Sequence, residues 1–542
     1  MNVDEVLKYE PSKSFEESRK SKSDDNDFEP RKKFKTGNLD HLSERERLEV
    51  LKMLENEPEG ELFTEASLKK LLLQFEKKFS KNQEMRIKYP DNPEKFMDSE
   101  VELNEVIQEM HVVSTRPDFY PLLLETSFVP SLLSLLGHEN IDISTAVISL
   151  LQEMTDLESS MENLDEIKLL IDFLFEQQIF SLLVQNLERF DETNKDENEA
   201  VHNCLAIFEN MVETKPSLSV ESTKQGLLQW LLKRIKVKGP FDSNKLYAAE
   251  LLSILVQNQD DNRKSLGEMD GIDTLLLQIA YYKKHKPTSA EEFEYMENLF
   301  NCLCSCLMLA SNRVKFLKAE GLHLMRLILR EQKHARNSAL KVLSYAMNNL
   351  DGKENCQAFV EMLGLGILFP LFMKPVSSGK KKNKDSYIND EHIVSIISSL
   401  LKNCTGENKQ RVIGKFVEND HEKIDRLMEL YYKYSEQVER VKLSDADEED
   451  SEDRDDELYM KKIENGLFAL QSIVYIIMDI YVNGQESIKS RINKLLNLRK
   501  EPKDKLVEIT KEYKENLGDD ETKSSSEIHQ ERERIDNLIL NF

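Results

Sequence analysis

The chain has 542 residues, a formal net charge of -26 and 32% charged residues, with only 17 Gly and 14 Pro. This length exceeds one compact core, so we expect several domains or one elongated repeat array, and the scarcity of helix breakers favours an all-α chain. An acidic surface repels phosphate backbones, which argues against direct nucleic-acid binding and favours basic partners. The alternative is that the acidic residues only keep a large array soluble.

Residues 1–40 are rich in Ser, Lys, Asp and Glu and lack apolar periodicity, so we expect a disordered tail. Two basic clusters ten residues apart lie inside it and match a bipartite nuclear import signal, which importin-α would bind. The alternative is a tail with randomly placed charges. The signal consists of Arg19, Lys20, Arg31, Lys32, Lys33 and Lys35. This spacing predicts a nuclear protein.

Residues 41–115 predict an N-terminal helical cap, because apolar side chains recur there at helical spacing. Pro90 and Pro93 interrupt this pattern. Since proline disfavours the helix interior and restricts the residue before it, the two prolines predict an ordered turn between two helices.

Residues 116–415 repeat a short apolar helix, a polar loop and a longer amphipathic helix. Four short helices open on Gly226, Gly271, Gly321 and Gly366, which are 45, 50 and 45 residues apart. A period near 45 is typical of armadillo and HEAT repeats, which stack into a right-handed superhelical solenoid because one unit cannot bury its apolar faces alone. We expect the short helices at 129–136, 179–187, 226–235, 271–279, 321–329 and 366–372, and the longer ones at 143–154, 200–212, 245–257, 291–310, 338–347 and 390–403.

Residues 416–515 predict a C-terminal helical cap, interrupted by a solvated acidic loop at 445–457, where ten of thirteen residues are Asp or Glu. Ser444 and Ser451 precede acidic residues and match sites of an acidophilic kinase, although any Ser in such a run would match. Residues 516–542 are expected to form a charged tail with one short helix.

We find no spacing typical of a catalytic, phosphate-binding or metal site, so we predict no enzyme activity, no cofactor and no metal. Cys302, Cys304 and Cys306 resemble a metal clip, but residues two apart on a helix point about 200° apart, so a packed core is expected. Trp230 is expected in the core as well. The apolar stretch Gly466–Val482 is short and interrupted by polar residues, which favours a buried helix over a membrane span.

A binding surface remains, because the longer helices of armadillo arrays line a concave groove. Its outward positions suit an extended basic peptide, and the alternative is ordinary solvent-facing polarity. The candidate groove residues are Glu209, Asn210, Glu250, Asn298, Asn301, Lys341, Tyr345 and Asn403.

Two adjacent segments carry a family resemblance. Arg86–Phe96 reads RIKYPDNPEKF, and Asn104–Val113 reads NEVIQEMHVV. Together they resemble the hallmark of the beta-catenin-like protein family of nuclear armadillo proteins in the splicing machinery. Further similar stretches lie at 225–234, 240–247, 296–309, 338–347 and 416–430.

The resemblance implies a non-enzymatic subunit associated with the Prp-nineteen complex of the activated spliceosome. It implies contact with a Myb-related splicing factor and recognition of basic, import-signal-like segments in partners. Vertebrate members also bind activation-induced deaminase. We therefore predict a nuclear splicing scaffold that binds proteins, with no membrane association.

One departure concerns the importin-α mode of reading lysines, which uses repeated Trp and Asn pairs. This chain has one Trp, so that mode is not carried over. Two alternative functions remain: a transport receptor for basic cargo, and a signalling adaptor of the catenin type. The second would favour a strongly basic groove.

Overall fold

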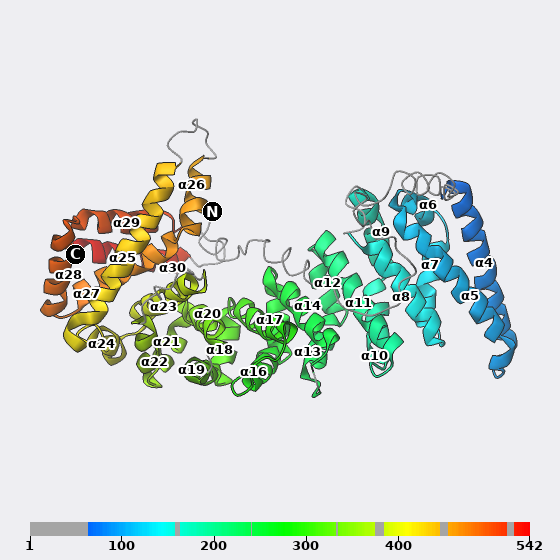
Figure 1. Ribbon diagram of the computed structural model, residues 1–542, viewed down its shortest axis with the longest axis horizontal. Helices are drawn as coiled ribbons and strands as arrows, with labels where there is room; N and C mark the ends of the chain where they lie inside the picture. The colour runs from blue at the N-terminus through cyan, green and yellow to red at the C-terminus, as the bar shows by residue number, and fades with distance from the viewer. Residues whose placement is uncertain are drawn as a thin grey trace, which may run out of the picture. The chain divides into compact units, whose positions relative to one another are not determined.

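The computed structural model describes residues 63–157, 163–239, 241–331, 334–373, 384–444, 454–517 and 525–542. The described residues divide into two compact units at Thr214/Lys215. Both consist of α-helices joined by short turns and 3-10 helices (Figure 1). The predicted all-α, armadillo-type repeat architecture is confirmed.

The N-terminal unit follows one order of helices. They are α4 (Glu65–Lys88), η2 (Pro93–Lys95), α5 (Met97–Glu109), η3 (Met110–Thr115), η4 (Pro117–Phe119), α6 (Tyr120–Leu124), α7 (Phe128–Ser134), η5 (Leu135–Gly137), α8 (Ile141–Thr155), α9 (Leu164–Glu176), α10 (Ile179–Arg189) and α11 (Lys195–Thr214). Consecutive long helices pack together, with α8 lying between α5 and α11.

The first two helices of this unit are joined by the predicted proline turn. Helix α4 ends at Lys88, and η2 begins at Pro93. Across the turn, Arg86 donates to Glu100 on α5 at 2.5 Å, and its guanidinium lies 4.9 Å from the centre of the Phe96 ring. The segment that carries the family resemblance therefore fixes α4 against α5.

The C-terminal unit is longer. Its helices are α12 (Leu218–Lys224), α13 (Leu227–Lys236), α14 (Ser243–Gln257), α15 (Asp260–Glu268), α16 (Gly271–Tyr281), α17 (Ala290–Cys306), α18 (Ala310–Lys318), α19 (Gly321–Glu331), α20 (Arg336–Met347), η7 (Leu350–Gly352), α21 (Lys353–Glu361), α22 (Leu365–Phe372), α23 (Lys384–Asn403), α24 (Gly406–Gly414), α25 (Glu418–Ser444), α26 (Arg454–Glu464), α27 (Leu467–Asn483), α28 (Glu486–Arg499), α29 (Lys503–Glu515) and α30 (Ser525–Asn541).

Each repeat of the C-terminal unit has three helices. The predicted short helices are the second helices α13, α16, α19 and α22, and the predicted longer ones are the third helices α14, α17, α20 and α23. Third helices of consecutive repeats pack side by side (Figure 1). The first helices α12, α15, α18, α21 and α24 were not predicted from sequence. They are short. Helices α15 and α18 bury an Asn and an Arg side by side in place of a leucine stripe, and α21 buries Asn355 beside apolar residues.

The buried Asn residues of α15 and α18 close the ends of the third helices α14 and α17. Asn262 on α15 donates to the Leu255 carbonyl of α14 at 2.8 Å and to the Ser219 hydroxyl of the preceding repeat at 2.7 Å. Asn312 repeats the arrangement one unit later. A helix ends with carbonyls that lack intrahelical partners, so these amides satisfy groups that would otherwise be buried unpaired.

The recurring glycines mark where a second helix touches the first. A Cβ on Gly321 would overlap the ring of Phe316, and a Cβ on Gly271 would overlap Leu266. In the sixth repeat this position belongs to Gly364, whose Cβ would overlap Phe359, whereas Gly366 has open space. The prediction that Gly366 continues the glycine series is therefore wrong by two residues.

The C-terminal end of the unit differs from the predicted tail. Helix α30 spans 17 residues and packs on α27 and α29, with Ile535 and Leu538 buried. It is therefore part of the packed array. Helix α27, predicted from Gly466–Val482 to be buried, is buried along almost its whole length. Among the described residues no single helix is long and apolar enough to cross a membrane, although three bent helix pairs pass by length and composition alone.

Candidate binding surface

The third helices of the C-terminal unit carry a row of half-buried polar side chains. Helix α14 begins at a Ser243 capped by Asp242, whose carboxylate accepts from the Lys245 N–H at 2.8 Å. Helix α17 is capped by Ser289 in the same way. These caps fix where each helix begins and hence which side chains leave the core. We call the set the third-helix row: Glu250, Glu297, Asn298, Asn301, Lys341 and Tyr345.

The structure joins predicted residues of neighbouring repeats within this row. Lys341 on α20 donates to Asn301 on α17 at 3.1 Å. One turn earlier, Ser338 donates to Glu297 at 2.7 Å. Glu297 and Ser338 were not among the predicted residues. Because they lie one helical turn from Asn301 and Lys341, the helical period alone could have indicated them.

Burial sets the charges of the row. It raises the pKa of Glu297, while the Ser338 hydrogen bond and the charge of Lys341 act in the opposite direction. Burial, with a smaller contribution from the charge of Lys341, lowers the pKa of His392 on α23 to about 4. His392 is therefore neutral at pH 7, and Lys341 is the cation of this part of the row.

Asn298 contributes an unused donor. Its Nδ2 atom is buried and has no hydrogen-bond partner among the described residues. A buried amide without a partner costs on the order of 1–3 kcal/mol. The donor is enclosed by protein atoms, so a ligand reaches it only if neighbouring side chains move.

Asn403 is wrongly predicted as a groove residue. It is only 4% exposed, and its amide donates to the carbonyls of Met347 and Asn349 at 3.1 and 2.7 Å. Both amide hydrogens are engaged in closing the end of α20. The residue therefore has no donor left for a ligand.

Glu209 and Asn210 lie on α11 in the N-terminal unit. Both are half-buried, and Asn210 donates to Thr155 on α8 at 3.3 Å. They belong to a different unit from the third-helix row, so the row is described without them.

Lys402 closes the row on its C-terminal side and was missed from sequence. Its ammonium lies 2.7 Å from Glu531 of α30, 3.1 Å from the Tyr513 hydroxyl and 4.4 Å from the centre of the Tyr475 ring. Burial is the largest single effect and would lower the pKa of Lys402, but Glu531, Tyr513 and Tyr475 together outweigh it, and the net pKa is raised. The partners come from residues far along the chain, which no local pattern indicates.

The cysteines lie in the core, as predicted. Cys302, Cys304 and Cys306 on α17 are all buried. Burial raises the pKa of Cys306 to about 12 and that of Cys302 well above its usual value, so these thiols are protonated and unreactive at pH 7. Among the described residues no group of three or more His, Cys, Asp or Glu could hold a metal ion. Trp230 is also buried, at 7% exposure.

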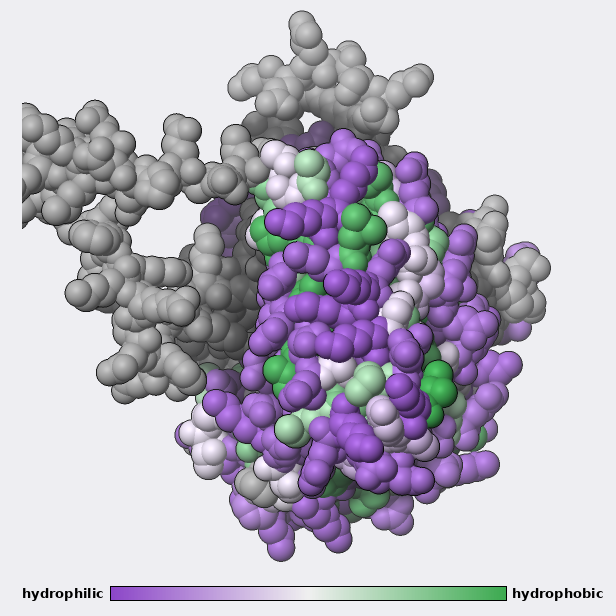
Figure 2. Space-filling model, turned by 90° about the vertical axis from the view of Figure 1, so that its right-hand side faces the viewer, coloured by the Kyte–Doolittle hydropathy of each residue, from purple (hydrophilic) through white to green (hydrophobic). Residues whose placement is uncertain are grey.

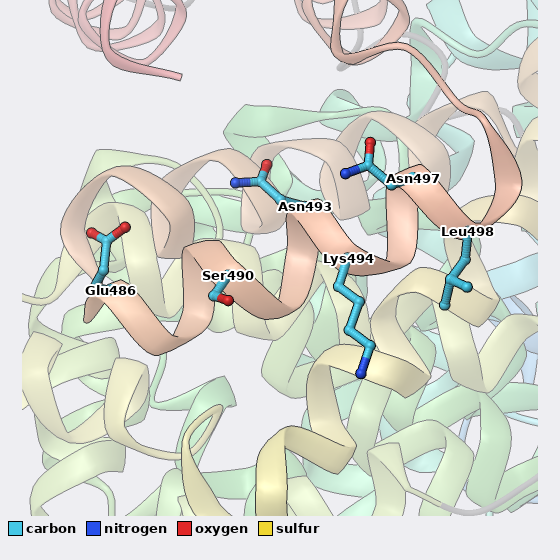
Figure 3. Close-up of a pocket in the computed structure, with 6 residues that line it drawn as sticks. All are labelled: Glu486, Ser490, Asn493, Lys494, Asn497 and Leu498. Carbon is cyan, nitrogen blue, oxygen red and sulfur yellow. The ribbon is translucent and has the colours of Figure 1, made fainter.

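Two further surface features lie away from the row. On the outer face of α28, six side chains between Glu486 and Leu498 line a depression, but all belong to one helix and face no opposing wall (Figure 3). At the α4–α5 end of the N-terminal unit, hydrophobic side chains are scattered among hydrophilic ones (Figure 2). Neither resembles an enclosed ligand pocket.

Several predicted positions lie outside the described residues. These are the import signal (Arg19, Lys20, Arg31, Lys32, Lys33 and Lys35), Ser451 and residues 445–453 of the acidic loop. Ser444 is the last residue of α25. Helix α26 begins at Arg454, inside the predicted loop.

Comparison with known proteins decides the family. The model of the family described as "Catenin-beta-like, Arm-motif containing nuclear" matches residues 45–511. The chain belongs to this family. Its relatives include "Beta-catenin-like protein 1" of Rattus norvegicus, 51% identical over 488 residues, which are 88% of this chain and 86% of that protein.

Further proteins match over a similar length. The Homo sapiens "Beta-catenin-like protein 1" is 50% identical over 490 residues, covering 88% of this chain and 86% of that protein. The Schizosaccharomyces pombe homolog is 33% identical over 499 residues, covering 90% and 85%. A solved engineered protein matches 85% of this chain and 99% of its own at 15% identity, with a TM-score of 0.42.

Proposed function

We propose that the protein is a non-enzymatic nuclear scaffold of the pre-mRNA splicing machinery that binds basic segments of partner proteins. The observation that carries this is membership of the catenin-beta-like family, whose description names an Arm-motif containing nuclear protein. The family resemblance in the sequence adds the Prp-nineteen complex and a Myb-related splicing factor as partners. Entry into the nucleus would use importin-α and the basic tail.

The third-helix row supports peptide binding. It offers the acidic side chains of Glu250 and Glu297 and the half-buried amides of Asn298 and Asn301. An extended peptide presents backbone carbonyls and, when rich in Lys and Arg, cations. Such a ligand would match the amides and acidic side chains at once.

The transport-receptor alternative is less well supported. Reading of lysines by a ladder of Trp side chains needs exposed indoles, and the one Trp of this chain, Trp230, is buried. The catenin-type adaptor is less well supported as well, because a strongly basic groove does not match the carboxylates of the third-helix row.

The binding test uses the full chain and a fluorescent peptide with two Lys/Arg clusters. Reversal of Glu250 to Lys should slow association more than it speeds dissociation, because charges at the protein surface mainly steer the encounter. The matched control reverses Glu84, which is exposed on the cap. Surface plasmon resonance over a salt series gives both rates, and binding that is insensitive to salt and to the Glu250 reversal would contradict the proposal.

The splicing assignment has its own test. Affinity purification of the tagged protein from nuclear extract, with mass spectrometry, should recover Prp-nineteen complex proteins. Their absence would refute the splicing role and leave peptide binding as a separate question.

A further inference from the structure

Lysines are concentrated in two connections between the second and third helices of a repeat. Residues 233–239, at the end of α13, contain four Lys or Arg and no Asp or Glu, and residues 281–290, after α16, contain three Lys and no Asp or Glu. We call five exposed lysines of these two connections the basic edge: Lys233, Lys236, Lys238, Lys284 and Lys286. Within the described part of the chain, none of the five forms an ion pair.

The two connections lie against the same part of α17. In the connection between α13 and α14, the Phe241 ring lies 5.9 Å from the Tyr295 ring of α17. Lys245 donates to the Val237 carbonyl at 3.1 Å, and its ammonium lies 5.7 Å from the centre of the same Tyr295 ring. In the connection between α16 and α17, the Thr288 N–H donates to the Glu292 carboxylate of α17 at 2.7 Å. Since Glu292 and Tyr295 are one turn apart, the lysines of both connections belong to one edge of the array.

A flat aromatic surface lies beside the lysines. The Tyr281 and His285 rings stack with their centres 4.3 Å apart and their planes 9° apart. Tyr281 is 52% exposed, and Leu277, one turn earlier, is 68% exposed. An exposed aromatic surface, on which a planar group can stack, therefore lies next to Lys284 and Lys286.

Carboxylates near the edge are largely compensated. Asp242 accepts from Arg234 at 2.7 Å, and Glu292 is held by Thr288. On the next connection, a hydrogen bond from Arg330 lowers the pKa of Glu331, with smaller effects from nearby Lys283 and Lys284. Glu291 on α17 is exposed and reduces the local charge by one.

We propose that the basic edge binds single-stranded RNA, with its lysines on successive phosphates and the stacked Tyr281–His285 pair under a base. Single strands are bound by combining a cationic track with aromatic side chains on which bases stack. An acidic peptide would use the lysines but would leave the aromatic stack without a matching group. RNA therefore fits both features.

The net charge of -26 is compatible with this assignment. That charge argues against nucleic-acid binding only as an average over the whole chain. At physiological ionic strength, exposed charges are screened beyond roughly 8 Å, so the local lysines govern what binds at this edge. The inference is independent of the proposed peptide binding, which uses the third-helix row.

The test uses the full chain and a fluorescent uridine oligonucleotide of about 12 nucleotides. Replacing Lys233, Lys236, Lys284 and Lys286 with Ala should weaken binding by at least about tenfold near 0.1 M salt and reduce the slope of log K against log salt by about 3. The matched control replaces Lys70, Lys77, Lys88 and Lys494, four exposed lysines elsewhere, and should stay within about twofold of the wild type. Equal binding by the edge variant and the wild type would overturn the proposal.

The aromatic contact is tested separately. Tyr281→Ala should weaken RNA binding about tenfold, whereas Tyr281→Phe keeps the ring and should bind like the wild type. A background with the six basic tail residues changed to Ala should retain binding; loss of binding there would assign RNA to the tail. Equal competition by polyglutamate of matched charge would mean that the edge binds acidic peptides, and the RNA assignment would be wrong.

Discussion

Two buried arginines, Arg263 and Arg313, donate hydrogen bonds to backbone carbonyls at the ends of the third helices α14 and α17. Arg313 is 4% exposed and donates to the Leu307 carbonyl and to the Asn348 carbonyl, both at 2.6 Å. It thus connects the end of α17 to the end of α20. A guanidinium is suited to this role because its donors are fixed in one plane.

Arg313→Ala should lower the free energy of unfolding by about 2–4 kcal/mol, because two buried carbonyls lose charged donors. Urea unfolding followed by circular dichroism measures this. The control is Arg330→Ala, which breaks an exposed pair with Glu331 and should cost less than about 1 kcal/mol. A similar loss of unfolding free energy in the two variants would contradict a stabilising role for the Arg313 hydrogen bonds.

His392 should make stability depend on pH. Its pKa falls to about 4 in the folded state, below the value of about 6.5 for an unfolded chain, so the unfolded state binds more protons between these values. Stability contributed by this group is therefore present above pH 6.5 and is lost as the pH falls to 4, by about 1–3 kcal/mol. His392→Gln should flatten this part of the curve in urea titrations.

A second variant tests the cause of the lowered pKa of His392. Lys341→Met should reduce the slope, since the charge of Lys341 helps to lower the pKa of His392. An unchanged slope in His392→Gln would assign the acid sensitivity to other groups.

At the scale of elements, the close contact between the first and second helices of a repeat requires a glycine, because a larger residue would overlap the first helix. Gly321→Ala should destabilise the protein by about 1–3 kcal/mol, because the new methyl group would overlap Phe316. Gly366→Ala is the matched change in a helix with open space, and it should be neutral or stabilise by up to about 1 kcal/mol. Thermal unfolding of both variants tests this, and an equal effect would show that the glycines are not packing positions.

The second and third helices could be predicted because their apolar residues recur at helical spacing. Helix α10, for example, begins at the predicted Ile179, and α14 ends at the predicted Gln257. The first helices could not be predicted, because Asn262 and Arg263 look polar but are buried by bonds to carbonyls of other helices. Burial of a polar group through distant partners leaves no periodic signal.

The candidate site was predictable to the level of the helix and less so to the residue. Asn301 and Lys341 were found because they lie on the outer faces of the third helices. Asn403 was misplaced since it continues the same pattern, yet its amide turns to the end of α20. Lys402 was missed because Glu531 lies more than a hundred residues away along the chain.

For the whole molecule, localisation should depend on the basic tail. Replacing Arg19, Lys20, Arg31, Lys32, Lys33 and Lys35 with Ala in a fluorescent fusion should shift the protein toward the cytoplasm. Fluorescence microscopy measures the nuclear fraction. A wholly nuclear variant would show that the tail is not required, and the basic-edge variant serves as a control because it removes lysines outside the tail.

The amide bonds of Asn262 and Asn312 have a consequence for how the array loses structure. Asn312 on α18 donates to the Cys306 carbonyl of α17 and to the Arg263 carbonyl of α15, at 3.0 and 2.9 Å, and both acceptors belong to the repeat before its own. In a linear array, stability is a sum of terms for single units and terms for neighbouring pairs, and these bonds increase the pair terms. Large pair terms favour loss of several units together over fraying from one end. Amide hydrogens of α14 and α17 should therefore exchange with solvent in a single event, at one common free energy of opening.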